Sequence, residues 1–221
     1  MAGIAIPDHI ISLRKRQFVQ ATDWGGTITV QDVTRDDIEP LSRLLAEVFQ
    51  EDPFHSWIFP NVSIRMRRQR RFFALSLRRR MGLDVMYTTP DHRGVCAWSG
   101  PNTPRSNILH ALWFKLLFGL NIGPRAPLLL PGVRRLISHQ PKYPHWYLSL
   151  LATHPEHRRQ GLGTTLLQPI LSQCDTEGIP AYLEATSEIS VAFYKHIGFV
   201  VVQEIKLPFG PTLWPMLRKP D

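Results

Sequence analysis

The chain has 221 residues, of which 43% are hydrophobic and 20% are charged. This composition excludes a disordered chain, and the length fits one large domain or at most two small ones. Lysine and arginine outnumber aspartate and glutamate by 26 to 18, so the net charge is +8. No stretch approaches the ~20 uninterrupted apolar residues of a membrane span. The basic cluster within Met1–Gln20 follows its apolar part, the reverse of a secretory signal, so we expect a cytoplasmic protein in which Cys96 and Cys174 are buried thiols.

The first elements alternate between strand-like and helix-like patterns. Residues 1–24 have no clear period and are expected to form a leader, poorly ordered or loosely docked, ahead of a single domain over 25–221. Residues 26–33 alternate apolar and polar side chains, which predicts a strand. Thr34 is then a candidate cap for a helix over 36–52, where apolar residues recur at helical spacing.

Residues 52–61 are rich in aromatic side chains and are predicted to form a turn that leads into a basic helix. That helix, residues 65–80, contains eight arginines and no acidic residue. The pattern favours an amphipathic helix with a solvated basic face. Attraction of an anionic cofactor comes second. Nucleic-acid binding is least favoured, because no DNA- or RNA-binding motif accompanies the arginines.

The middle of the chain predicts a β-hairpin and a helical insertion. Residues 83–89 and 95–100 are predicted to be two strands around a Pro-Asp-His-Arg-Gly turn. Prolines and glycines interrupt residues 102–143, yet the segments 108–120 and 128–137 have helical periodicity. We expect the insertion to supply core or a lid rather than a membrane-surface helix or a partner contact.

The last third of the chain carries the sharpest pattern. Residues 145–153 form a nearly continuous apolar run, as in a central strand buried on both faces. The elements expected after it are a helix over 162–174, a strand over 178–186, a short helix over 190–197 and two terminal strands over 198–207 and 211–218.

A glycine-rich loop, residues 154–163, joins the apolar strand to the next helix and places two arginines ahead of two glycines. Leu166 stands where a dinucleotide fingerprint needs a third glycine or alanine, and threonines follow Gly163 where a Walker loop needs lysine. The remaining pattern is Arg158-x-x-Gly161-x-Gly163, in which backbone N–H groups at a helix start converge on an anion. The loop therefore predicts a phosphate site.

A second motif, Phe193-Tyr194-x-x-x-Gly198-Phe199, follows at the turn from the short helix into a strand. Together with the glycine loop it resembles the GNAT acyltransferase superfamily, whose cofactor is acetyl-CoA. The likeness covers residues 145–218 well and the first half only by the order of its elements. The segments GIPAYLEATS and LPFGPTLWPMLRKP further resemble the puromycin N-acetyltransferase group. The implied fold is α/β: a single domain with a mixed, strongly twisted sheet, helices on both faces and a helical insertion before the central strand.

The resemblance implies cofactor contacts residue by residue. The end of the apolar strand offers backbone groups to the pantetheine arm, as an added strand would, and the glycine loop holds the pyrophosphate. Ser187 stands where many relatives carry an asparagine that contacts the cofactor or the tyrosine. The implied cofactor-binding residues are Leu151, Ala152, Thr153, Arg158, Arg159, Gln160, Gly161, Leu162, Gly163, Thr164 and Ser187.

Two residues carry the implied chemistry. Tyr194 matches the position whose hydroxyl faces the cofactor sulfur and protonates the leaving thiolate; the alternative is an aromatic plug between helix and sheet. The acceptor amine must lose a proton before it attacks a thioester, since a free alkylammonium has a pKa of about 10. Glu184 is the first choice for the base because its strand should deliver it beside the reactive end. An ion pair with an arginine is the alternative for Glu184, and His154 and His157 are the next candidates.

Three histidines could be read as the ligands of a metal site. His154 and His157 lie three residues apart and could be joined by His145. No carboxylate or thiol is expected to complete the set, so we predict no metal.

The sequence thus predicts an acetyl-CoA-dependent N-acetyltransferase that transfers the acetyl group directly, without a covalent enzyme intermediate, to a primary amine of a small molecule. Four aromatic residues are candidates for the acceptor site: Phe54, Trp57, Trp98 and Trp146. The alternatives are a protein or peptide N-acetyltransferase and a non-catalytic acyl-CoA-binding or nucleic-acid-bound regulator. No nucleic-acid partner is expected, and the protein is expected to be a monomer or a homodimer.

Overall fold

The computed structural model describes residues 18–21, 27–103, 119 and 122–221. The strands in this part of the chain are β1 (Phe18–Ala21), β2 (Thr27–Asp32), β3 (Val85–Thr88), β4 (Gly94–Ser99), β5 (Trp146–Thr153), β6 (Ala181–Ala185), β7 (Val200–Val201), β8 (Ile205–Lys206) and β9 (Thr212–Arg218). The helices are α2 (Ile38–Val48), α3 (Pro53–Ile58), α4 (Val62–Arg80), α6 (Ala126–His139), α7 (Leu162–Glu177) and α8 (Glu188–His196), with 3-10 turns η1 (Gly123–Arg125) and η2 (Pro155–His157).

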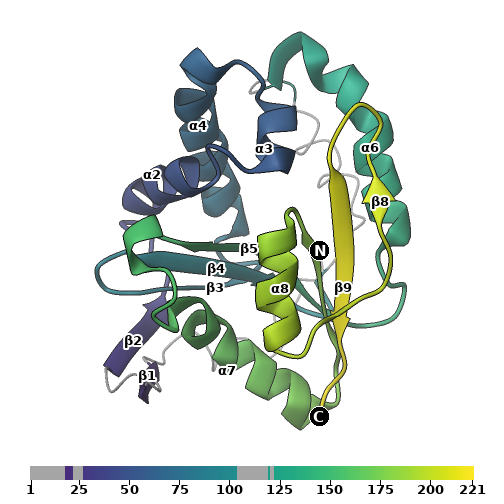
Figure 1. Ribbon diagram of the computed structural model, residues 1–221. Coiled ribbons are helices and arrows are strands. Elements are labelled where there is room, and N and C mark those ends of the chain that lie inside the picture. Colours follow the sequence, from purple (N-terminus) through teal and green to yellow (C-terminus); the bar gives the residue numbers. More distant parts are fainter. Residues whose placement is uncertain (1–17, 22–26, 104–118, 120–121) are drawn as a thin grey trace, which may run out of the picture.

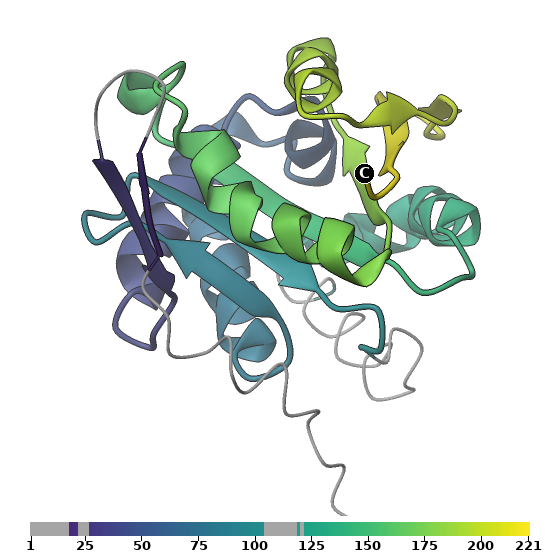
Figure 2. The same cartoon turned by 90° about the horizontal axis from the view of Figure 1, so that it is seen from below.

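The strands form one mixed sheet in the order β1-β2-β3-β4-β5-β6-β9-β7, and β8 pairs with β9. The β5–β6 pair is parallel, and the other pairs among the described strands are antiparallel. Figure 1 shows α2 and α4 on one side of the central strands and α7 on the other, and Figure 2 shows the same layers from below. The predicted α/β fold with helices on both faces is confirmed. None of the described helices has the length and apolar character that a membrane crossing requires.

Two details near the start of the fold correct the sequence prediction. Asp37, not Thr34, precedes α2, and the backbone N–H and the hydroxyl of Thr34 both donate to the Asp37 carboxylate. The aromatic-rich segment is a helix, α3, rather than a turn. The Asp52 carboxylate accepts a hydrogen bond from the backbone N–H of His55 at 2.9 Å, and Pro53 begins the helix. A capping aspartate followed by proline is a strong helix start, which outweighs the low helix propensity of the aromatic residues.

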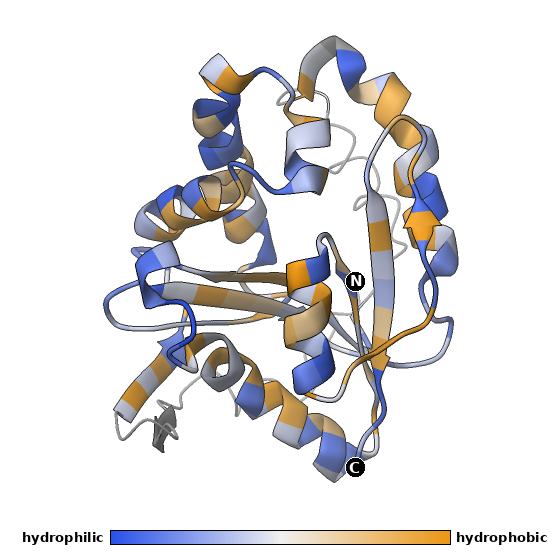
Figure 3. Cartoon of the chain, viewed as in Figure 1, coloured by the Kyte–Doolittle hydropathy of each residue, from blue (hydrophilic) through white to orange (hydrophobic). Residues whose placement is uncertain are grey.

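The basic helix α4 is amphipathic, as predicted. Phe73 and Leu77 are buried against α2 and the sheet, while Arg67 and Arg71 are exposed. Much of α4 is hydrophilic, whereas β4 and β5 are mainly hydrophobic (Figure 3). Arg65 differs from the exposed arginines, because its guanidinium donates to three backbone carbonyls of the segments that precede and follow α3, those of Gln50, Phe59 and Pro60. This arginine is therefore a structural clamp.

The predicted hairpin and most later elements are confirmed. The strands β3 and β4 pair antiparallel, and α6 covers the second predicted helix of the insertion. The predicted terminal strand 198–207 is instead two short strands, β7 and β8. Of the predicted leader, residues 18–21 form β1, which pairs with β2, and the rest lies outside the described residues. The predicted helix 108–120 lies almost wholly outside them too.

The central strands separate at one level of the sheet. The pairing of β5 with β6 ends at Leu148 and Leu183. The register between β5 and β4 shifts at the same level, so that Ser149 is an extra residue in β5. Such a bulge bends its strand and reverses which face each later side chain meets. Accordingly, Trp146 and Leu148 pack on the α7 side, whereas Ala152 packs on the side of α2 and α4.

A glycine in β4 lets α7 approach the sheet closely. A Cβ atom at Gly94 would lie 2.7 Å from Leu166 Cδ1, 3.3 Å from Leu162 Cδ2 and 3.2 Å from the carbonyl oxygen of Ala152. Leu162 is the first residue of α7, so this contact fixes where the helix begins relative to the end of β5. The absence of a side chain at Gly94 thus sets the position of α7 and of the glycine-rich loop that precedes it.

Replacing Gly94 with alanine should destabilise the protein by about 1–3 kcal/mol, because the added methyl group overpacks the α7–β4 contact. Chemical denaturation of Gly94→Ala against the wild type measures this. The matched control is Gly100→Ala, where the new methyl group would meet its nearest neighbour at 3.5 Å. Equal stability of the two variants would show that α7 tolerates a wider spacing.

Candidate active site

A cleft of about 1770 Å³ lies where β5 and β6 separate. Its floor is the end of β5 and the glycine-rich loop, one wall is residues 47–53 between α2 and α3, and the other wall is residues 186–197 of α8 and its approach. The structure brings the following predicted site residues to this cleft: Leu151, Ala152, Thr153, Arg158, Arg159, Gly161, Leu162, Gly163, Thr164, Ser187 and Tyr194. Gln160 faces a smaller cavity beside β2, and its amide donates to the carbonyl of Glu156 at 3.3 Å.

The glycine-rich loop presents unpaired backbone donors to the cleft. Gly161 precedes α7 with φ of 74°, a left-handed conformation that glycine adopts without strain. The N–H groups of Leu162, Gly163 and Thr164 begin the helix, and none donates to an acceptor within the described residues. Arg158 lies exposed at the rim. Helix-start donors beside arginine form a binding site for an anion such as phosphate.

One edge of β5 is also available. Residues Leu151–Thr153 pair with β4 on one side. On the other side the pairing with β6 has already ended. This edge faces the cleft and can accept an extended ligand as an added strand. The cleft therefore joins an unpaired strand edge to the helix-start donors of the glycine-rich loop.

Tyr194 reaches the cleft from α8. Ser187 caps the helix, because its hydroxyl accepts from the backbone N–H of Ser190 at 3.2 Å. The Tyr194 ring packs edge-on against Phe193 and Phe199, with centroids 5.1 and 5.8 Å away. Burial raises the pKa of the Tyr194 phenol, so the hydroxyl keeps its proton near neutral pH. It can act as a hydrogen-bond or proton donor.

Glu184 lies beside the point of strand separation but outside the cleft lining. Its carboxylate accepts a hydrogen bond from the Tyr147 hydroxyl at 2.7 Å and one from the Gln140 amide at 3.1 Å. Burial and the adjacent Glu184 charge raise the pKa of Tyr147 well above its usual value, which keeps this phenol a donor. The neighbouring residues Leu183 and Ala185 pack in the core on the α7 side of β6. Glu184 lies between them and therefore faces the opposite side of the sheet.

The four predicted acceptor aromatics lie elsewhere. Trp98 and Trp146 are 0% and 1% exposed in the core beside α7, because the alternation of β4 and β5 turns them inward. Trp57 is held between α6 and the β8–β9 turn: Cβ atoms at Gly132 and Gly210 would each lie 2.8 Å from its ring. Phe54 packs beside Trp57, and none of the four lines the cleft. The sequence alone does not show whether an aromatic residue packs in the core or contacts a ligand.

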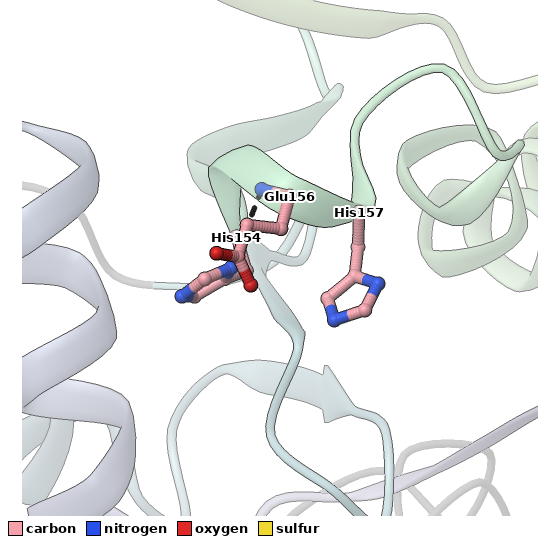
Figure 4. Close-up of side chains that lie close together, drawn as sticks. All are labelled: His154, Glu156 and His157. Carbon is pink, nitrogen blue, oxygen red and sulfur yellow. Dashed lines mark hydrogen bonds between the residues drawn. The ribbon is translucent and has the colours of Figure 1, made fainter.

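The predicted metal set also changes. His145 is buried and lies within hydrogen-bonding distance, 2.7 Å, of the carbonyl of Tyr143, whereas Glu156 joins His154 and His157 at and just before η2. The ligand atoms of these three residues lie within 4.8 Å of one another (Figure 4). The expectation that no carboxylate completes the set was therefore wrong. Their closeness follows from one short turn, and no metal enters the function proposed below.

The sequence interpretation missed the wall between α2 and α3. Asp52 lines the cleft, its side chain is 10% exposed, and its carboxylate contacts the His55 ring nitrogen Nδ1 at 2.9 Å. The hydroxyl of Thr186, after β6, donates to the same carboxylate. Burial acts to raise the pKa of Asp52, but the hydrogen bonds and charge of His55, with the bond from Thr186, outweigh it and hold the pKa below its usual value. An aspartate that precedes a helix-starting proline was the only signal in the sequence.

Comparisons with known proteins agree with this geometry. Residues 131–199 match the acetyltransferase (GNAT) family. Over 144 residues the chain is 27% identical to an uncharacterized N-acetyltransferase of Schizosaccharomyces pombe, an alignment that covers 59% of this chain and 58% of that protein, less than two thirds of its length.

Solved structures extend the likeness over most of the chain. A structure described as histone acetyltransferase HPA2 and related acetyltransferase, from Corynebacterium glutamicum, matches with a TM-score of 0.64 and 25% identity over 87% of this chain and 96% of that one. Arylalkylamine N-acetyltransferase 2 from Aedes aegypti shares the fold with a TM-score of 0.56 and 13% identity, over 87% of this chain and 98% of that one. The family match and the fold thus show similarity to GNAT acetyltransferases and support an acyltransferase activity.

Proposed function

We propose that the protein transfers the acetyl group of acetyl-CoA to a primary amine. One observation carries the proposal: a single cleft joins an unpaired strand edge, a helix-start phosphate loop and a protonated tyrosine. Each feature fits one part of acetyl-CoA. The β5 edge suits the amide groups of the pantetheine arm, and the donors of Leu162–Thr164 suit the pyrophosphate.

Acetyl-CoA supplies an acetyl group activated as a thioester. The hydroxyl of Tyr194 donates its proton to the sulfur as the carbon–sulfur bond breaks and the carbon–nitrogen bond forms. Glu184 accepts the proton that the amine loses, directly or through water. Cys96 and Cys174 are buried thiols, as the sequence predicts, and burial raises the pKa of each to about 12. Neither is a nucleophile at neutral pH, which supports direct transfer.

The acceptor is proposed to be a small amphipathic amine. The likeness to the puromycin N-acetyltransferase group supports the same class. The direct test measures free thiol released from acetyl-CoA with aminonucleosides, arylalkylamines and polyamines, and with lysine ε-amino groups of peptides as the contrasting class. Transfer to peptides alone would contradict the small-molecule assignment.

Coenzyme A should raise the melting temperature. At 100 times its Kd, binding to the folded state should increase the free energy of unfolding by about 2.7 kcal/mol. Gly163→Val should abolish the shift, because a Cβ there would already lie 3.2 Å from Phe193 Cζ and the larger side chain blocks the loop. Far-UV circular dichroism and the melting temperature without ligand serve as fold controls. An undiminished shift in folded Gly163→Val would rule out the phosphate loop.

Tyr194→Phe should lower kcat by about 10²-fold or more while the Kd for acetyl-CoA changes little, since the hydroxyl acts on the departing sulfur. Steady-state kinetics and acetyl-CoA titration separate the two effects. The control is Tyr143→Phe, an exposed tyrosine outside the cleft lining, which should keep wild-type kinetics. Weaker binding with unchanged turnover would make Tyr194 a packing residue.

Glu184→Gln should slow acetylation chiefly below about pH 8, where the amine arrives as an ammonium and must lose a proton on the enzyme. At higher pH more of the amine is already neutral, so the variant should approach the wild type. The pH–rate profiles of both proteins test this, with Glu177→Gln on the outer surface of α7 as control. Parallel profiles would assign the proton transfer to another group or to water.

A further inference from the structure

Glu184, the proposed base, accepts hydrogen bonds from two different elements. Its Oε2 accepts from the Tyr147 hydroxyl at 2.7 Å, and its Oε1 accepts from the side-chain amide of Gln140 at 3.1 Å. Tyr147 belongs to β5, whereas Gln140 directly follows α6 of the insertion. Because each carboxylate oxygen has its own donor, the two bonds fix the rotation of the carboxylate as well as its position.

Tyr147 is itself held by the neighbouring strand. It lies opposite Tyr182 in the parallel pairing of β5 with β6, and the two ring centroids are 6.0 Å apart. Tyr182 is buried, and its ring packs edge-on against that of His145 with centroids 5.5 Å apart. The Tyr147 ring therefore rests on a fixed aromatic neighbour, which limits the directions in which its hydroxyl can point.

Gln140 is held through α6. The residue caps the end of this helix, and its backbone N–H donates to the carbonyl of Ile137 at 3.3 Å. Earlier in α6, a Cβ atom at Gly132 would lie 2.8 Å from the ring of Trp57, so the helix packs closely against α3. The part of the insertion that the structure describes thus contacts the proposed base through one side chain whose backbone is fixed.

Two phenols face Glu184 from the central strands. Burial, and after it the charge of Glu184, raises the pKa of Tyr147 and of Tyr182, so both phenols keep their protons near neutral pH. Arg80, at the end of α4, lowers the pKa of Tyr147, but by less than burial raises it. On β9 the residue opposite Glu184 is Pro215. Donors to a carboxylate stabilise its charged form, which is the form that accepts a proton.

We infer that Tyr147 and Gln140 are positioning residues for Glu184, which hold its carboxylate in one orientation and stabilise the charged form that takes the proton from the amine. The inference rests on the proposed acetyl transfer and gives the insertion a role at the site. Neither donor reacts, because the Tyr147 phenol keeps its proton and an amide does not titrate. Both residues therefore act through Glu184, and their loss changes the pH range in which Glu184 can work.

The test follows the protonation of Glu184 both directly and through catalysis. In protein labelled with carbon-13 at the glutamate carboxyl groups, the Glu184 signal is the one that Glu184→Gln removes, and its chemical shift is recorded against pH. Tyr147→Phe should raise the titration midpoint by about one pH unit, because a hydrogen bond to a charged group is lost. The acid limb of the kcat/KM profile should move in the same direction by a similar amount. Gln140→Met should also raise both midpoints, and it keeps the inference testable if Tyr147→Phe does not fold.

Two matched variants serve as controls. The amide of Gln173 donates to the Glu177 carboxylate at 2.7 Å on α7, outside the cleft lining, so Gln173→Met should keep both wild-type midpoints. Tyr143→Phe, at an exposed tyrosine, should keep them too. The inference is wrong if neither Tyr147→Phe nor Gln140→Met moves the carbon-13 midpoint, or if that midpoint moves while the kcat/KM profile stays unchanged. A wild type that releases no thiol with any amine would contradict the proposed acetyl transfer, and the carbon-13 titration would still decide whether the two donors control the charge of Glu184.

Discussion

The separation of β5 from β6 is the constraint on which the site depends. Two parallel strands in a sheet normally leave no room between them, because their backbone groups pair along their length. Here the extra residue Ser149 bends β5 at the level where its pairing with β6 stops. The separation exposes the edge of β5 and opens the cleft that Tyr194 and the glycine-rich loop line. A regular ladder at this level would remove the groove, whatever residues lined it.

The two carboxylates near the cleft differ in their surroundings. Asp52 contacts His55 and Thr186, and these contacts hold its pKa below the usual range, so it stays charged near neutral pH. Glu184 is held by the phenol of Tyr147 and the amide of Gln140 beside the strand separation.

The sequence predicts the parts of the site that local chemistry determines. The glycine-rich loop, the tyrosine motif and the apolar strand are short patterns whose spacing requires a strand, a turn and a helix. Trp98 and Trp146 show where such reasoning fails, because the alternation of β4 and β5 turns both side chains into the core beside α7, and an aromatic residue in a sequence does not reveal whether its face of the strand meets core or ligand. Asp52 and Thr186 lie far apart in the chain, and only the packing of α3 against the end of β6 brings them together.

Two glutamines near the cleft wall between α2 and α3, Gln50 and Gln69, have buried side-chain oxygens without a partner among the described residues. Leaving such an oxygen unpaired costs about 1–3 kcal/mol, so a chain retains one only where something offsets the loss. The unpaired oxygen of Gln69 has a structural explanation, since the amide of the same side chain fixes the carbonyl of Phe49. Gln50 has no comparable bond from its side chain among the described residues, yet it lines the cleft beside a charged aspartate. Gln173 on α7 also has a buried Oε1 without a partner among the described residues, and it lies outside the cleft lining, so an unpaired oxygen marks a cost in stability and does not by itself identify a ligand.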